Sequence, residues 1–211
     1  MVMSSVALAT EDELSETIGI RLLAEMKNPL RVSLLLRKNG FGYLRSKMNS
    51  WCQISTQQPV ILLTDLDKKE CPTVLIDDWF GDRARPENFL LRVAVREIEA
   101  WLLADHTAMR SLLGKKGKLP VDPDAIDDPK RYLIDLAKNA KRDVRSDLVV
   151  LKGAVATQGA GYNSRLIELI RTEWCPTRAA ERSASLSRAM KRIEELSDRL
   201  MHIRPSPTKA E

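Results

Sequence analysis

The sequence predicts an α/β fold: a mostly parallel sheet with helices on both faces, followed by a helical C-terminal extension. In the first half of the chain, apolar runs of strand length alternate with stretches whose apolar residues recur every three or four positions. The connections between them are short, which is typical of strand–helix–strand units with right-handed crossovers. Acidic residues follow three of the four expected strands, at the position where parallel sheets bind ligands.

Two strand–helix pairs are predicted before residue 55. Residues 6–10 form a short apolar strand, and the acidic run 11–13 opens a helix that Asn28-Pro29 ends. Residues 31–36 predict the second strand. A glycine-containing turn then leads to a second helix that carries Leu44, Met48 and Trp51 on one face.

Two further pairs follow. The run of four apolar residues at 60–63 predicts a strand buried on both faces, and Cys71-Pro72 starts a helix that Gly81 ends. Residues 89–96 predict a fourth strand. It runs directly into residues 97–105, which are expected to become helical within a residue or two.

The rest of the chain is predicted to be mainly helical. A mobile basic loop over 114–127, with Lys115, Lys116 and Lys118, precedes a helix that Asp128 caps and Pro129 begins. Later elements are a fifth strand over 147–153, a helix through 166–170 and a final helix over 185–201. We therefore expect one domain over 1–177 with an insertion at about 106–146, a C-terminal helix over 178–204 and a disordered tail over 205–211.

Composition narrows the classes of function. No apolar run approaches the length of about 20 residues that a membrane span needs, and the N-terminus lacks a secretory signal pattern. Three widely spaced cysteines fit a reducing cytoplasm and predict neither a disulfide framework nor a zinc site. With only two histidines, any metal must be bound by carboxylates. The formal net charge of +5 weakly favours a polyanionic substrate.

The acidic residues after the strands are the candidate site. Asp65 and Asp67 follow the third strand, and strand alternation predicts that both carboxylates point the same way. Glu11 follows the first strand, and Glu97 and Glu99 follow the fourth, sharing a face only if that strand persists. The ends of parallel strands meet at one edge of a sheet, so all five can converge there. Crowded carboxylates repel unless a cation bridges them, and Mg²⁺ favours oxygen ligands. The alternative is that they cap helices and interact with helix dipoles.

Three motifs carry a family resemblance. They are Thr-Glu-Asp-Glu-Leu-Ser-Glu at 10–16, Leu-Thr-Asp-Leu-Asp at 63–67 and Arg-Glu-Ile-Glu-Ala-Trp-Leu-Leu-Ala-Asp at 96–105. Their order resembles the Toprim domain of topoisomerases, primases and overcoming-lysogenization-defect nucleases. They resemble more closely a group of small Toprim-like proteins of unassigned function. Some members of the wider group are encoded beside ABC-type ATPases in bacterial defence loci.

The resemblance implies a Toprim/Rossmann-like fold and a role for each matching residue. Glu11 takes the place of a metal ligand or general acid/base, and Asp65 and Asp67 take the place of the metal-binding pair. Glu97 and Glu99 match the later acidic ligand of the nuclease branch, and Lys152 is the candidate for its late lysine. The implied function is a nuclease dependent on Mg²⁺ or Mn²⁺ that acts on DNA or RNA, with an ABC- or SMC-type ATPase as partner in phage defence.

Two other interpretations stay open at this point. The chain could be a catalytically silent Toprim-like module that binds an ATPase or nucleic acid and keeps the acidic cluster as a relic or structural metal site. An Asp-x-Asp after a strand also occurs in phosphatases of the haloacid dehalogenase type. Here Lys68 and Lys69 follow the pair instead of the residues usual in that family, which ranks this reading lower.

Overall fold

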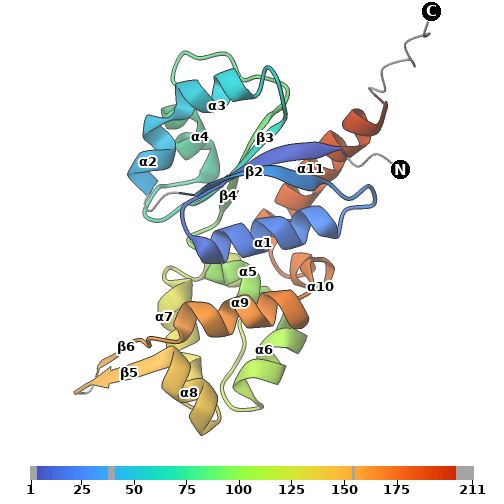
Figure 1. The fold of residues 1–211 in the computed structure, drawn as a ribbon. Coiled ribbons are helices and arrows are strands. Elements are labelled where there is room, and N and C mark those ends of the chain that lie inside the picture. The colour runs from blue at the N-terminus through green and yellow to red at the C-terminus, as the bar shows by residue number, and fades with distance from the viewer. Residues whose placement is uncertain (1–3, 38–40, 154, 203–211) are drawn as a thin grey trace, which may run out of the picture.

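The computed structural model describes residues 4–37, 41–153 and 155–202, with the backbone alone at Phe41 and Lys152. A four-stranded sheet forms the centre of the upper part of the molecule in Figure 1. Its strands are β1 (Ser5–Thr10), β2 (Arg31–Arg37), β3 (Val60–Asp65) and β4 (Phe89–Ala94), in the spatial order β2-β1-β3-β4. Every neighbouring pair is parallel. The expected parallel sheet is therefore confirmed.

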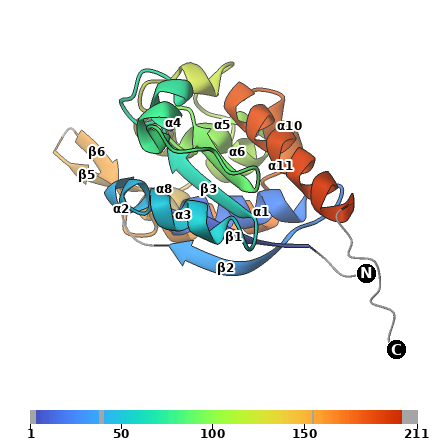
Figure 2. The ribbon, with the colours of Figure 1, turned by 90° about the horizontal axis from the view of Figure 1, so that it is seen from above.

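Helices cover both faces of this sheet, as expected for strands that are apolar on both sides. Leu8, Ile61 and Leu63 face one core, which α1 (Glu13–Ala24) and α11 (Ala184–His202) complete. Ala9 and Leu62 face the other core, beneath three helices. These are α2 (Phe41–Ser46), α3 (Met48–Ile54) and α4 (Pro72–Phe80). Figure 2 shows α11 and the α2–α4 group on different sides of the strands.

A helical lobe is inserted between β4 and α11, below the sheet in Figure 1. Its elements, in chain order, are α5 (Glu99–Ala104), α6 (His106–Leu113), the 3₁₀ turn η1 (Pro123–Ala125), α7 (Pro129–Ala137), α8 (Arg142–Leu148), β5 (Val149–Lys152), β6 (Val155–Gln158), α9 (Tyr162–Thr172) and α10 (Pro176–Ala180). The core of the lobe is continuous with the core between the sheet and α1. After α10 the chain returns to the sheet as α11, whose buried stripe includes Leu186, Ile193 and Leu196.

Several predicted elements need correction. The second helix is two helices, because the chain bends at Lys47 and the Trp51 indole N–H donates to the Leu44 carbonyl over 2.9 Å. The fourth strand ends at Ala94 instead of residue 96, whereas the next helix begins at Glu99, within the two residues expected. The cap at Asp128 is confirmed, since its carboxylate accepts the Arg131 N–H over 2.7 Å. The tail at 205–211 lies outside the described residues.

The fifth strand is not part of the parallel sheet. It begins at Val149, and it pairs antiparallel with β6, with Val150 opposite Thr157. Only two residues separate β5 from β6, which is enough for a hairpin, whereas a parallel neighbour needs a long crossover connection. Along the parts of the chain that are described, no helix has the length and apolar character needed to cross a membrane.

Candidate acidic site at the carboxyl end of the sheet

The chain leaves β1 and β3 toward opposite faces of the sheet. The helix after β1 packs on one face of the sheet and the helix after β3 packs on the other, so the two chain segments diverge as they leave adjacent strands. Open α/β sheets bind ligands at such a switch point, outside the carboxyl ends of the strands. Glu11 is the first residue after β1, and Asp65 is the last residue of β3. The two residues therefore meet at this switch point.

Glu11 and the end of β3 are joined by hydrogen bonds. The Glu11 carboxylate accepts from the Thr64 hydroxyl and from the backbone N–H of Asp65, the latter over 3.3 Å. Burial raises the pKa of Glu11, the two hydrogen bonds oppose that rise, and the charges of Asp67 and Asp12 add to it. Sequence analysis did not identify Thr64. The strand register could have indicated Thr64. Ala9 lies opposite Leu62, and two more residues along each strand bring Glu11 opposite Thr64.

The surroundings of Asp65 disfavour its charged form. Its Oδ1 is inaccessible to solvent, and no hydrogen-bond donor reaches it from the described residues. Burial is the main cause that holds the pKa of Asp65 well above its usual range, followed by repulsion from Glu99 and then from Glu11. A buried carboxylate oxygen without a donor is costly unless it is protonated or bound to a cation.

Asp67 does not lie as strand alternation predicted. β3 ends at Asp65, and Asp67 is an exposed residue of the following turn with a left-handed backbone, φ 50°. Its N–H donates to the carbonyl of Arg96 over 2.8 Å, and Arg96 is also left-handed, at φ 60°. The Arg96 guanidinium in turn donates to the carbonyls of Asp67 and Lys69, each over 3.1 Å. Non-glycine residues rarely adopt this conformation, and such strain is concentrated at functional sites. Burial raises the pKa of Asp67, and Lys68 opposes the rise.

Glu97 and Glu99 point in different directions because a helical turn begins between them. Glu97 is half-buried and accepts the backbone N–H of Lys130, at the start of α7, over 2.9 Å. Glu99 is only 4% exposed and accepts the Tyr162 hydroxyl over 3.0 Å. Burial raises the pKa of Glu97, and it raises the pKa of Glu99 to about 7. Of the two, Glu99 interacts with Asp65, whereas Glu97 interacts with Asp67.

Two residues at this edge were missed by sequence analysis. The Lys130 ammonium lies 3.9 Å from Glu99 Oε1 and 5.3 Å from the centre of the Tyr162 ring. Tyr162 begins α9 after Gly161, where an added Cβ would lie 2.8 Å from Asp147 Cβ. Neither residue carries a local signal, because both reach the site through packing of the helical lobe against the sheet.

The comparison with known proteins gives one match. A family model described as a domain of unknown function, DUF4276, matches residues 9–146. The chain belongs to the DUF4276 family. The matched region contains all five candidate acidic residues and Lys130, and it ends before Tyr162 and Lys152. No curated protein and no solved structure matches the chain.

Lys152 lies beyond the DUF4276 match and does not share the position of the acidic residues. Its backbone belongs to β5, in the hairpin of the helical lobe, and its side chain lies outside the described part of the structure. Lys152 does end the predicted fifth strand, but that strand pairs with β6 and does not join the main sheet. Lys130 is the lysine that the DUF4276 fold brings to Glu97 and Glu99.

The acidic side chains of this DUF4276 site offer carboxylate oxygens, which is the type of ligand that hard cations favour. The pKa of each of the five carboxyl groups is raised, mainly by burial, and Asp65 Oδ1 lacks any partner. Among the described residues, however, no three His, Cys, Asp or Glu side chains are grouped closely enough to hold a metal ion as they stand. Binding an ion therefore requires some of these side chains to change rotamer.

Proposed function

We propose that this DUF4276 protein is a Toprim-like nuclease that hydrolyses phosphodiester bonds with Mg²⁺ or Mn²⁺. The observation that carries the proposal is Asp65, whose partnerless buried oxygen lies among other acidic residues at the switch point of the sheet. Glu11, Asp65, Asp67, Glu97 and Glu99 are the residues that would hold the ions. Bound divalent ions would polarise the phosphodiester and offset the negative charge of the reacting groups.

The protein groups around the ions have roles that follow from their contacts. Thr64 and the Asp65 N–H fix the Glu11 carboxylate, which is the candidate general base because it lies next to Asp65 at the switch point and is only partly buried. Tyr162 and Lys130 hold Glu99 in place. Arg96 holds the Asp67 turn through two backbone carbonyls. Together these contacts would hold Glu11, Glu99 and the Asp67 turn near one another, so that only small changes of rotamer would bring their carboxylates onto an ion.

The direct test is cleavage by the purified full-length protein. Labelled single- and double-stranded DNA and RNA are incubated with Mg²⁺, with Mn²⁺ or with EDTA. We expect cleavage of at least one substrate that depends on the divalent ion and is lost in EDTA. Absence of cleavage under all these conditions, with the protein folded, would contradict the proposal for the protein acting alone.

A second candidate function is a non-catalytic Toprim-like module that binds an ATPase or a nucleic acid. The specific observation in its favour is that no metal-ready group of three side chains exists among the described residues. Divalent-dependent cleavage of a nucleic acid separates the two functions. A silent module cleaves nothing whether or not it binds Mn²⁺, whereas the nuclease binds Mn²⁺, with release of protons from the carboxyl groups of raised pKa, and cleaves.

The wider context is also a proposal. The formal net charge of +5, despite the acidic cluster, supports a nucleic-acid substrate, DNA or RNA, whose phosphates need neutralising. We propose an ABC- or SMC-type ATPase as the protein partner, a role in phage defence and a cytoplasmic location. The motifs at 10–16, 63–67 and 96–105 support these proposals through their resemblance to the Toprim-like proteins encoded beside such ATPases.

Glu11→Gln tests the proposed base. The change keeps the shape of the side chain and its acceptor for Thr64 but removes the charge. We expect cleavage to fall by roughly 10², while stability without metal stays equal or rises. Cleavage kinetics and thermal melts with and without Mn²⁺ measure the two effects. Glu13→Gln, two residues further along on exposed surface, is the matched control. Wild-type cleavage and an unchanged Mn²⁺-induced shift in melting would place Glu11 outside the site.

Lys115, Lys116 and Lys118 are expected to contact substrate phosphates. The loop that bears them is anchored, since the Arg110 guanidinium donates to the carbonyls of Gly114, Lys116 and Gly117. All three lysines are exposed. Replacing them with Ala should weaken nucleic-acid binding and reduce the slope of log K against log salt by roughly 2 to 3. The control replaces three exposed lysines elsewhere, Lys27, Lys47 and Lys191. An unchanged slope would assign the loop to solvent-exposed surface without a binding role.

A further inference from the structure

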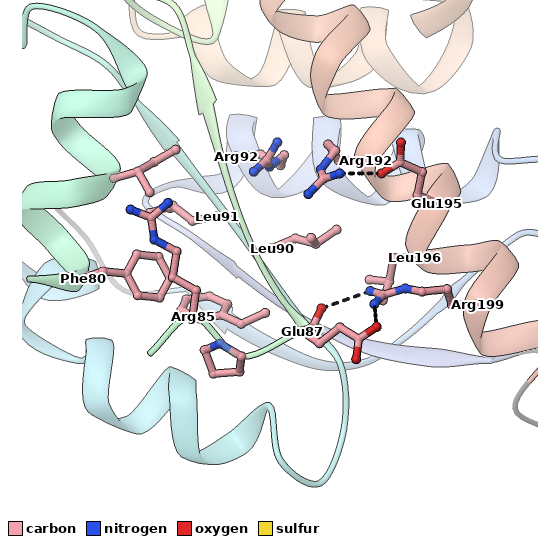
Figure 3. Close-up of a pocket in the computed structure, with 13 residues that line it drawn as sticks. Phe80, Arg85, Glu87, Leu90, Leu91, Arg92, Arg192, Glu195, Leu196 and Arg199 are labelled. Atoms are coloured by element: carbon pink, nitrogen blue, oxygen red, sulfur yellow. Dashed lines mark hydrogen bonds and ion pairs between the residues drawn. The ribbon is translucent and has the colours of Figure 1, made fainter. Parts of the chain in front are cut away.

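A groove runs along the open edge of β4, between α4 and α11. Figure 3 shows α4 on one side, α11 on the other and β4 between them. The groove encloses about 460 Å³ along the first part of β4. A second hollow of about 170 Å³ continues past Leu91 and Val93 to Ser185 and Arg188. The groove therefore follows most of the length of the strand.

The floor of the groove is a strand edge with unused hydrogen-bonding groups. Val60 N–H donates to Asn88 and Leu66 N–H donates to Ala94, so the even-numbered residues of β4 direct their backbone groups toward β3. Leu91 and Val93, in the alternate positions, direct their N–H and C=O groups into the groove. Among the described residues β4 pairs only with β3, and such an open edge can accept another extended chain.

The two walls of the groove differ in chemistry. The wall on the α4 side presents Ile76 and Phe80 beside the strand, and the Arg85 guanidinium lies 5.3 Å from the centre of the Phe80 ring. Arg85 pairs with Asp77 of α4. The wall on the α11 side carries Arg188, Arg192 and Arg199. Arg92, on β4, points to this second wall, because it shares the face of Leu90. An extended chain in the groove would thus meet Ile76 and Phe80, with a paired arginine over the ring, on one side and a more strongly basic surface on the other.

Part of this positive charge has no partner. Arg192 pairs with Glu195 over 2.7 Å, and Arg199 pairs with Glu87, as Figure 3 shows. In the described part of the chain, Arg92 and Arg188 make no ion pair. The Arg92 Nε is also buried without a hydrogen-bond partner. The groove is therefore complementary to an acidic ligand.

We propose that this groove binds an acidic segment of a partner protein as an added strand on β4. The segment would alternate acidic side chains toward α11 with apolar side chains toward α4. A polynucleotide is a poorer match, because phosphates only accept hydrogen bonds and would leave the Leu91 and Val93 carbonyls unpaired. Strand addition uses backbone bonds for affinity and alternate side-chain contacts for specificity. This inference goes beyond the proposed nuclease function and does not rest on it.

The probe is a fluorescein-labelled heptapeptide that alternates Glu and Val, and binding is followed by fluorescence anisotropy. A peptide of the same composition with Glu and Val segregated tests alternation. An alternating peptide N-methylated at every second amide tests backbone pairing. We expect both to bind roughly tenfold or more weakly than the probe, because each lost hydrogen bond or mismatched side chain lowers affinity. Equal binding of all three peptides would overturn strand addition in favour of unspecific charge attraction.

Two variants of α11 locate the binding. Arg188→Glu reverses an exposed charge of the groove, and Lys191→Glu makes the same change on the same helix away from the groove lining. We expect Arg188→Glu to weaken binding of the probe roughly 5- to 10-fold and Lys191→Glu to leave its affinity nearly unchanged. Equal effects of both variants would overturn the proposal. Peptide binding that neither variant changes would also overturn it, because it would place the peptide elsewhere, for example at the other edge strand, β2. Binding of an oligothymidine that depends on Arg188 but not Lys191, without peptide binding, would assign the groove to nucleic acid instead.

Discussion

Asp65→Asn is expected to weaken Mn²⁺ binding strongly and to lower the rate of cleavage by roughly 10³, without destabilising the metal-free protein. Asp65 has a buried oxygen with no donor, and Glu99 and Glu11 repel its charge. The raised pKa means that ionised Asp65 opposes folding, so stability from this group is lost as pH rises through the folded pKa. A neutral amide removes that cost. A metal ligand of the same size but without charge, in contrast, binds a hard cation far more weakly.

The measurements are Mn²⁺ calorimetry, thermal melts in EDTA and in Mn²⁺, and cleavage rates. Asp65→Asn combined with Asp67→Asn should show no Mn²⁺ heat at all, since both members of the Asp-x-Asp pair lose charge. Asp82→Asn, at the opposite end of α4 on exposed surface, is the matched control and should behave as wild type. Equal Mn²⁺ binding by the double variant would contradict the metal site. A large loss of stability in EDTA would mean that Asp65 has a structural role instead.

The strands of the sheet could be predicted because the patterns that specify them lie within short stretches of sequence. Apolar runs such as 60–63, the Asn28-Pro29 stop and the Asp128-Pro129 cap each specify an element without knowledge of the rest of the fold. The parallel arrangement then followed from the short connections, and it brought Glu11 to Asp65 across 54 residues. That juxtaposition is the part of the site that sequence reasoning predicted best.

The failures have physical causes that lie beyond local sequence. Asp67 left the strand because the turns after β3 and β4 bond to each other through Arg96, and no pattern within either turn predicts that pairing. Lys152 ends its strand as predicted, but an apolar strand does not reveal its partner, and here the partner is the adjacent β6. Lys130 and Tyr162 depend on how the helical lobe packs, which periodicity does not specify.

Glu99→Gln is expected to stabilise the metal-free protein at pH 8 and to have little effect near pH 4.5. Burial raises the pKa of Glu99 to about 7, whereas the group has its ordinary value of 4.5 in the unfolded chain. Between these values the unfolded state loses its proton and the folded state keeps it, so wild-type stability falls as pH rises through this window. The free energy of unfolding that the wild type loses across this window is at most about 3 kcal/mol at pH 8. Gln keeps an acceptor for the Tyr162 hydroxyl and removes the repulsion on Asp65.

Urea unfolding in EDTA at pH 4.5, 6 and 8 measures this difference for the wild type, Glu99→Gln and the control Glu168→Gln, an exposed position on α9. The gain from Glu99→Gln should grow across the three pH values, and the control should show no such trend. Tyr162→Phe should have the opposite effect, because the tyrosine hydroxyl lowers the pKa of Glu99 and its loss raises that pKa further. A gain that is independent of pH would mean that Gln merely packs better. A loss of stability at pH 8 would show that the Lys130–Glu99 pair outweighs the cost of burying the charge.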